Sequence, residues 1–253
     1  MSKTIKINFF AAFVVTLLMA CAPQKSVKKS GESEQMTAEA SKNKLLAEVD
    51  SFLSNASFEK ETSDKIALVD SWYSCDFRGE SPADVQPGSY GVTLKAFKGK
   101  KCIGMVTRST GTYEAICSRL LKALRPDSVY QFEVYACLSP RYASSVRPLK
   151  VKKKGEIEQQ NTQLYSFAKP VVLQVWGCDD VCDPVELLGV TPAVANFAWQ
   201  LYQIKIRPQT NYKHLMLQVY YDYKENAVPY NGHILIDALS LKTDDKKIFE
   251  LKN

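Results

Sequence analysis

The feature that most constrains the fold is a series of short segments in which apolar and polar residues alternate. In one of them Phe132 and Val134 alternate with Gln131 and Glu133, as expected of a strand with one face in a core and the other toward solvent. This period of two recurs several times after residue 55. The alternating segments are 130–138, 171–176, 201–207, 215–223 and 234–241.

Turn-forming residues stand between these segments. They occur at 86–88 (Gln-Pro-Gly), 98–100 (Lys-Gly-Lys), 125–127 (Arg-Pro-Asp), 207–208 (Arg-Pro) and 231–232 (Asn-Gly). Short strands that are separated by turns, with no long helical pattern between them, are typical of β-sandwiches and barrels. We therefore expect an all-β protein built as an antiparallel β-sandwich.

The beginning of the chain has the features of a targeting segment. A short apolar run, 9–21, follows Lys3 and Lys6 and ends in Leu-Met-Ala-Cys, which resembles the lipobox that directs lipid attachment to Cys21 and cleavage just before it. The run is too short to cross a membrane, which takes about 20 apolar residues. A plain secretory signal and an uncleaved anchor are the alternatives, but cysteine directly after a small residue favours the lipoprotein form.

This assignment divides the chain into three parts. We expect a cleaved signal peptide over 1–20, a flexible tether over 21–44 that begins at lipidated Cys21, and a domain over 45–253 that starts with a short helix at 45–53. Acyl chains, palmitate among them, would hold the protein on a bilayer, and we expect the outer membrane of a bacterial envelope. The polar stretch 139–167 is long for a loop and is interpreted as an insertion, either solvated or partner-binding.

The charge and the cysteine content of the chain limit which partners, disulfides and metal ions we expect. The formal charge of +6 is mild, and its basic residues form no compact motif with aromatic residues, so we expect no nucleic-acid partner. Apart from Cys21 the chain has six cysteines, an even number that permits disulfides in an exported protein. Cys178 and Cys182, in a short polar loop, are the expected pair, whereas zinc is disfavoured because two histidines and one close cysteine pair make a poor ligand set.

Motifs near both ends of the domain resemble a known family. Residues 55–59 (Asn-Ala-Ser-Phe-Glu) and 234–241 (Ile-Leu-Ile-Asp-Ala-Leu-Ser-Leu) are similar to the opening and closing motifs of galactose-binding-like jelly rolls, the fold of many carbohydrate-binding modules. The segments between them resemble those of envelope lipoproteins and adhesin modules that share this fold. The resemblance covers about residues 52–243 and implies a jelly-roll topology for the sandwich.

The resemblance also implies a structural calcium ion. In many such modules a glutamate near the start and an aspartate near the end help hold this ion, and the matching residues here are Glu59 and Asp237. Calcium takes six to eight oxygen ligands. The lysine-rich loop 98–101 departs from the family pattern, because cations beside a divalent ion are unfavourable. The alternative is that Glu59 caps a turn and Asp237 is hydrogen-bonded near the sheet edge.

A second implication of the resemblance is carbohydrate binding, in which aromatic side chains contact the apolar faces of sugar rings. The candidate ligand-binding residues are Trp72, Arg108, Glu114, Gln174, Trp176 and Trp199. Gln174 and Trp176 share one face of the segment 171–176, and Arg108 and Glu114 flank a tight turn at 109–112 that would bring them together. Core packing for the tryptophans and a simple ion pair for Arg108 and Glu114 are the alternatives.

Three functional classes follow. The first is a membrane-anchored, non-catalytic binding protein for a carbohydrate or cell-wall polymer such as peptidoglycan. The second is a structural or assembly lipoprotein that docks to another envelope protein and has no sugar ligand. The third, an enzyme, is disfavoured because the chain contains no Gly-x-Ser-x-Gly, His-Glu-x-x-His or phosphate-binding glycine motif, although a glycosidase needs only two carboxylates.

Overall fold

The computed structural model describes residues 51–64, 66–75, 77, 80–145, 164–224 and 227–244. These residues belong to a compact unit that runs from Leu46 to Asn253, and they form thirteen strands and no helix. None of the described segments is therefore a helix of the length and apolar character that crossing a membrane requires. The expected signal peptide, Cys21, the tether and most of the expected helix at 45–53 lie outside the described residues.

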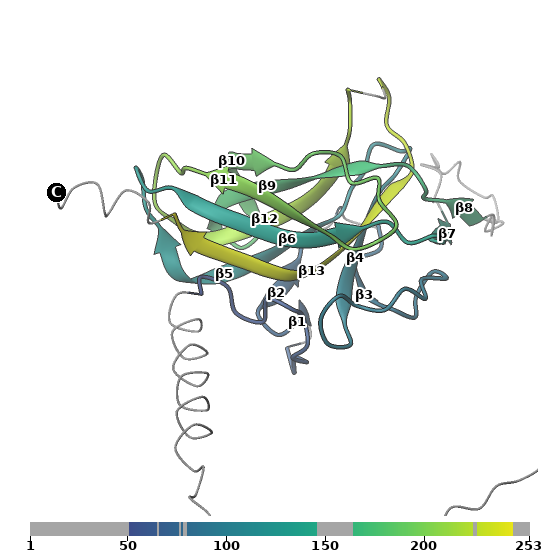
Figure 1. Ribbon diagram of the computed structural model, residues 1–253, viewed down its shortest axis with the longest axis horizontal. Coiled ribbons are helices and arrows are strands. Elements are labelled where there is room, and N and C mark those ends of the chain that lie inside the picture. The colour runs from purple at the N-terminus through teal and green to yellow at the C-terminus, as the bar shows by residue number, and fades with distance from the viewer. Residues whose placement is uncertain are drawn as a thin grey trace, which may run out of the picture. The chain divides into compact units, whose positions relative to one another are not determined.

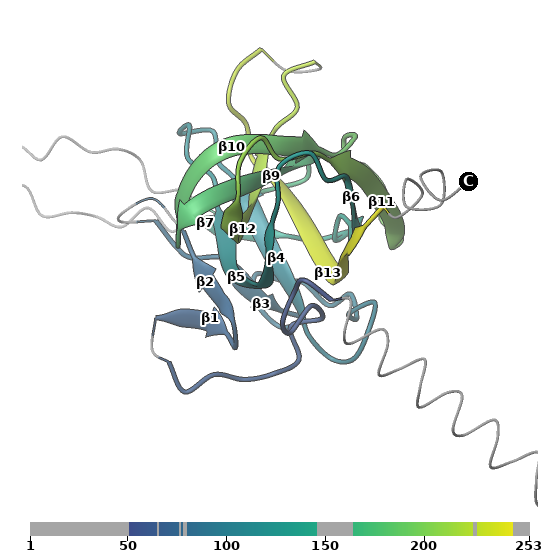
Figure 2. The ribbon, with the colours of Figure 1, turned by 90° about the vertical axis from the view of Figure 1, so that its left-hand side faces the viewer.

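The domain is a sandwich of two antiparallel sheets, which Figures 1 and 2 show facing each other. The larger sheet has six strands. In spatial order they are β1 (Ala67–Val69), β2 (Trp72–Ser74), β5 (Ala115–Leu124), β12 (Tyr212–Tyr221), β9 (Val171–Asp180) and β10 (Asp183–Val190). The expected all-β sandwich is thus confirmed.

The second sheet has five strands. In spatial order they are β11 (Gln200–Ile206), β6 (Tyr130–Cys137), β13 (Gly232–Thr243), β4 (Cys102–Thr107) and β3 (Asp84–Gln86). Its last strand in sequence, β13, lies at the centre between β6 and β4. Because β13 is buried along most of its length, this last strand is an integral part of the core.

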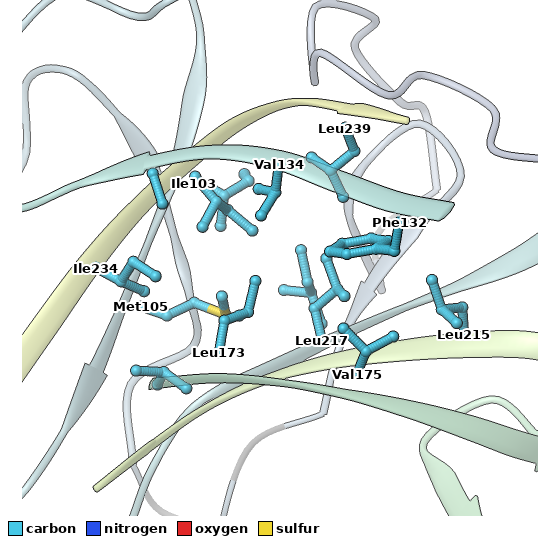
Figure 3. Packing of buried hydrophobic residues seen from close by; sticks show 14 of the residues in the cluster. Ile103, Met105, Phe132, Val134, Leu173, Val175, Leu215, Leu217, Ile234 and Leu239 are labelled. Carbon is cyan, nitrogen blue, oxygen red and sulfur yellow. The ribbon is translucent and has the colours of Figure 1, made fainter. Parts of the chain in front are cut away.

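The core fills the space between the two sheets (Figure 3). Phe132 and Val134 of β6 point from one sheet toward Val175 and Leu217 of the other, and all four side chains are fully buried. Removing a buried phenylalanine side chain costs about 3–5 kcal/mol in proteins of this kind. The alternating pattern therefore reflects burial, because the inward-facing apolar residues of these segments contribute to this one core.

All five alternating segments of the sequence are strands, namely β6, β9, β11, β12 and β13. Between and before them lie strands that alternation does not reveal. All six residues of β4 are buried, so its two faces are both apolar, whereas β10 is exposed along most of its length. A strand needs the alternating pattern only where one face meets the core and the other meets water.

The segment 139–167 begins and ends in a small separate sheet. Strands β7 (Ala143–Ser145) and β8 (Leu164–Ser166) pair antiparallel, and the part of the expected insertion between them, 146–163, lies outside the described residues. The two ends of the excursion are thus close together at the domain surface. This arrangement is that of an insertion between β6 and β9, not of a further strand of either large sheet.

The disulfide expected between Cys178 and Cys182 is wrong. Cys182 is bonded to Cys75, 107 residues earlier in the chain, with a Cα–Cα distance of 5.3 Å. Cys178 is a buried free thiol on β9. The turn between β9 and β10 carries Cys182 across the outer face of the six-stranded sheet to the end of β2, so proximity in sequence does not decide the pairing.

Candidate functional site

The outer face of the six-stranded sheet carries the candidate site. On β9 and β12, the directly opposed pairs Trp176–Met216, Gln174–Gln218 and Val172–Tyr220 lie on one face. The residues between them in sequence belong to the core on the other face. Because successive side chains of a strand point to opposite sides, this second face is left for contacts outside the core.

Four aromatic rings form a continuous row along this face. Phe77 contacts Tyr113 edge-on with ring centroids 4.9 Å apart, and Tyr113 contacts Tyr220 at 5.1 Å. Tyr220 in turn lies 5.8 Å from Tyr223. Edge-to-face pairs at these separations are favourable, so the rings hold one another in place and present a ready-made aromatic surface.

Gln174 is the polar group at the centre of this surface. Its Oε1 accepts hydrogen bonds from Trp176 Nε1 at 3.2 Å and from Gln218 Nε2 at 2.9 Å. Both bonds use the oxygen of the amide, so the NH₂ group is the end that can donate to a ligand. The contact with Trp176 also ties its indole ring to Gln174.

Gln174, Tyr220 and Tyr223 line a groove of about 680 Å³ between β9, β12 and the segment that follows β10. Its walls include Val172, Gln174, Val190, Thr191, Pro192, Tyr220, Asp222, Tyr223 and Lys224. This volume lies within the range of about 300–1,000 Å³ that is typical of small-molecule sites. Apolar rings with a few polar groups at the edge are the usual lining of such sites.

Tyr220 and Tyr221 of the groove are neutral at physiological pH. Burial raises the pKa of Tyr220 above its ordinary value of 10, and the nearby Tyr223 and Tyr113 raise it further. The pKa of Tyr221, which also lines the groove, is likewise raised, chiefly by burial. Their hydroxyls therefore act as hydrogen-bonding groups, and not as bases or nucleophiles.

A buried ion pair positions the hairpin that carries Tyr113. Arg108 Nη2 contacts Glu114 Oε1, and the other carboxylate oxygen accepts a bond from the Val106 amide at 3.0 Å. The Tyr221 hydroxyl also donates to the carbonyl of Arg108 at 2.7 Å. The tight turn thus brings Arg108 and Glu114 together as its sequence predicts.

The proposal that Arg108 and Glu114 themselves grip a ligand is corrected by their burial. They are 2% and 1% exposed, and protein partners hold Arg108 Nη2 and both carboxylate oxygens of Glu114. Trp72 has the same outcome, because it is fully buried in the core, with its ring 5.4 Å from Phe58 and its Nε1 donating to the Asn55 carbonyl. Core packing and ion pairing are the roles that the structure supports for these three.

Trp199 lies away from the groove. It precedes β11 of the five-stranded sheet, donates from Nε1 to the Lys95 carbonyl at 3.0 Å and contacts Phe97 at a centroid distance of 6.3 Å. Of the six candidate ligand residues, only Gln174 and Trp176 are therefore brought together at the surface. Sequence reasoning missed the tyrosines beside them, although Tyr220 stands on the outward side of an alternating segment and could have been found there.

Glu59 and Asp237 meet the same loop, 98–101. Glu59 Oε1 accepts bonds from the amides of Lys100 and Lys101, both at 2.8 Å, and Asp237 Oδ2 accepts one from the amide of Lys98 at 2.8 Å. Burial raises the pKa of Asp237 to about 6, and the Glu59 charge contributes to the rise.

This geometry does not favour calcium, which needs oxygen ligands, because the loop turns amide nitrogens toward the two carboxylates. Among the residues that the structure describes, no group of three or more His, Cys, Asp or Glu side chains could hold a metal ion. The calcium ion stays a prediction. The contacts match the alternative in that Glu59 caps a turn and Asp237 is hydrogen-bonded, but Asp237 lies on β13, the central strand, and not near the sheet edge.

Comparison with protein-family models and with curated proteins gives no match. Among solved structures, the protein is similar to carbohydrate-binding β-sandwich domains, including the CBM22-1 xylan-binding domain of Xyn10C from Paenibacillus barcinonensis (16% identity, 74% of this chain and 91% of that one, TM-score 0.39). It is also similar to a CBM4 domain (10% identity, 69% and 95%, TM-score 0.36). A cleaved adhesin domain of Lys-gingipain from Porphyromonas gingivalis is another such structure (12% identity, 74% and 96%, TM-score 0.41). At these values nothing about a ligand follows for this chain.

Proposed function

We propose that this protein is a membrane-anchored, non-catalytic binding protein whose groove takes a carbohydrate or cell-wall polymer. In this proposal Cys21 carries the lipid after removal of residues 1–20, residues 21–44 are a flexible tether, and the sandwich is a jelly roll. Peptidoglycan and other envelope polysaccharides are the ligand class, because a tethered domain meets polymers of the same layer. The proposed location is the outer membrane.

The observation that carries the proposal is the groove of the six-stranded sheet. Sugar rings present apolar C–H faces that pack against aromatic side chains, and hydroxyls that need hydrogen-bonding partners. Tyr220 and Tyr223, which line the groove, supply the first kind of contact, and Tyr113 supports the ring of Tyr220 from outside it. The NH₂ group of Gln174 and the carboxylate of Asp222 supply the second at its edge.

The chemistry of the groove supports binding without catalysis. Glycoside hydrolysis needs a pair of carboxyl groups on either side of the scissile bond. Of the described residues that line the groove, Asp222 alone carries a carboxylate, and its Oδ1 accepts a bond from the Lys224 amide at 3.2 Å. The acidic pair that a hydrolase would need is not assembled there.

Retention on polymers tests the proposal. The full chain in mild detergent is passed over insoluble peptidoglycan and a panel of insoluble polysaccharides, beside the Tyr223→Ala and Phe197→Ala variants. Both side chains are large and exposed, at 47% and 55%, but Phe197 lies outside the groove. We expect retention of wild type and Phe197→Ala and at least a tenfold weaker retention of Tyr223→Ala, since stacked rings contribute about 0.5–1.5 kcal/mol each beyond their buried area.

The anchor is tested separately by Cys21→Ser. We expect the wild-type protein to sediment with the outer membrane and the variant to leave the membrane fraction, because a single acyl chain or none binds only weakly. Retention of the variant in the membrane would refute lipidation at Cys21. That outcome would leave the groove proposal standing, because the two tests have different readouts.

A specific observation also supports the second candidate, an assembly protein that docks to another envelope protein. Strand β10 is an edge of the six-stranded sheet and exposes Val185 and Leu187, at 53% and 43%. An exposed apolar edge strand can pair with a strand of a partner. Failure of every polymer to retain the protein, together with co-purification of one envelope protein that Val185→Lys abolishes, would favour this candidate over the first.

A further inference from the structure

Four cysteines gather at one place on the outer face of the six-stranded sheet. Cys117 of β5 and Cys178 of β9 are fully buried, and both cysteines of the disulfide, Cys75 and Cys182, pack against them. In the sheet β5 and β12 lie between β2 and β9, so the Cys75–Cys182 bond spans these two strands. The two free thiols lie in the same small cluster of buried residues as the disulfide.

Cys117 and Cys178 lie in one buried cluster on strands β5 and β9, which flank β12. The neighbouring Cys178 thiol lowers the pKa of Cys117, and the backbones of Cys182 and Ser118 lower it further, against the opposing effect of burial. The neighbouring Cys117 thiol and burial raise the pKa of Cys178. Of the two thiols, Cys117 is therefore the more readily ionised.

Cys117 lies beside the disulfide. It pairs with Tyr73 of β2, and the amide of Cys75, two residues further on, donates to the Ala115 carbonyl of β5 at 2.8 Å. Cys75 and Cys182 both pack against the cluster that contains Cys117. A thiolate beside a disulfide is the reactive arrangement for exchange, since the thiolate and not the thiol is the nucleophile.

We propose that the four cysteines form an internal thiol–disulfide exchange site, in which the Cys117 thiolate attacks Cys182 Sγ of the Cys75–Cys182 bond. A Cys117–Cys182 bond forms and the Cys75–Cys182 bond breaks. The electron pair goes to Cys75 Sγ, which takes up the proton that Cys117 has lost. No electrons enter or leave the protein, so the step needs no external oxidant or reductant.

Exchange changes the surface of the domain. The original bond ties the turn between β9 and β10 to the segment after β2, and the new bond ties the same turn to β5. Cys75 is then a free thiol two residues before Phe77, the first ring of the aromatic row. The disulfide that is present thus determines whether the segment that carries Phe77 is covalently tied to the turn between β9 and β10. This holds for any ligand of the groove.

The other two free cysteines serve as internal controls. Cys102 and Cys137 are buried strand residues of the five-stranded sheet, and burial is the chief cause that raises the pKa of each to about 12. Neither belongs to the cluster that contains the disulfide. They report opening of the whole domain, which would expose every buried thiol alike.

Native-state alkylation tests the proposal on the wild-type full chain in mild detergent. The protein is held at pH 8 with N-ethylmaleimide, quenched with acid, digested with pepsin and mapped by mass spectrometry. Cys75 can be alkylated only after its disulfide opens, and the reagent then prevents return. We expect alkylated Cys75 to appear together with a Cys117–Cys182 link, at least tenfold faster than alkylated Cys102 or Cys137.

Two variants sharpen the result. Cys117→Ser should keep the Cys75–Cys182 link throughout, and Cys137→Ser, which removes an equally buried thiol, should behave as wild type. The proposal is overturned if wild-type Cys75 stays bonded to Cys182, or if it is alkylated only as fast as Cys102 and Cys137. It is also overturned if folded Cys117→Ser releases Cys75 at the wild-type rate. None of these readouts depends on a ligand of the groove.

Discussion

The buried ion pair between Arg108 and Glu114 should be among the most sensitive points of the domain. Both residues are almost completely buried, and Glu114 bonds to Arg108 Nη2 and to the Val106 amide. Removing one partner of such a pair costs about 3–5 kcal/mol, because the other charge stays buried without compensation. We therefore expect Glu114→Gln to destabilise the protein strongly.

The structure places this variant at the lower end of that range. The amide oxygen of Gln at position 114 can still accept from Val106, and Arg108 Nε keeps its contact with Glu80 Oε2 at 3.5 Å. We expect a loss of about 3 kcal/mol in the free energy of unfolding. For a domain of this size the loss lowers the Tm by roughly 6–12 °C.

Urea unfolding followed by circular dichroism measures the loss, with Glu61→Gln as the matched control. Glu61 pairs with Lys101 at 2.8 Å, but its side chain is 86% exposed, so we expect its loss to leave the transition unchanged. Replacing both buried partners by Arg108→Met and Glu114→Leu should restore part of the stability, since the two most buried charges are then removed together and only Glu80, which is less buried, loses its partner. The reasoning is refuted if Glu114→Gln is as harmless as Glu61→Gln.

Three further predictions concern other parts of the domain. The pKa of Asp237 is raised to about 6 from an ordinary 3.8, so its protonated form stabilises the fold below about pH 4 and this contribution is lost as pH rises through 6. The urea midpoint of Asp237→Asn should therefore change less between pH 4 and pH 6 than that of the wild type, and an equal change in both proteins would contradict the prediction. Reducing Cys75–Cys182 should lower the free energy of unfolding by about 2–5 kcal/mol, as its long loop implies, and an unshifted urea midpoint would argue against the bond. Because backbone amides hold Glu59 and Asp237, EDTA should leave the Tm unchanged; a fall that calcium reverses would establish the ion.

Most of the sandwich can be predicted from alternation, and the exceptions have a physical cause. Strands such as β6 and β12 have one face in the core and the other outside it, so their sequences alternate and predict them directly. β4 is covered on both faces and β10 is exposed along most of its length, so neither shows the pattern. The disulfide could not be predicted because the turn that carries Cys182 crosses two strands to reach Cys75.

The candidate site could be predicted only in part, for a related reason. Alternation shows that Gln174 and Trp176 share a face, but it does not say which strand lies beside them. Only the pairing of β9 with β12 places Tyr220 next to Val172 and Gln174. Trp72 and Arg108 were attractive as residue types, and their burial follows from contacts that lie far away in the sequence.

Hydroxyl-radical footprinting tests the central claim, that the groove of the six-stranded sheet binds a polymer, most directly. The protein is oxidised alone and with the polymer that retains it, and each tyrosine is quantified by mass spectrometry. Tyr223 in the groove and Tyr90 outside it are exposed to a similar degree, 47% and 37%. We predict that polymer protects Tyr223 and Tyr220 and leaves Tyr90 unchanged, whereas equal oxidation of Tyr223 with and without bound polymer would contradict the account.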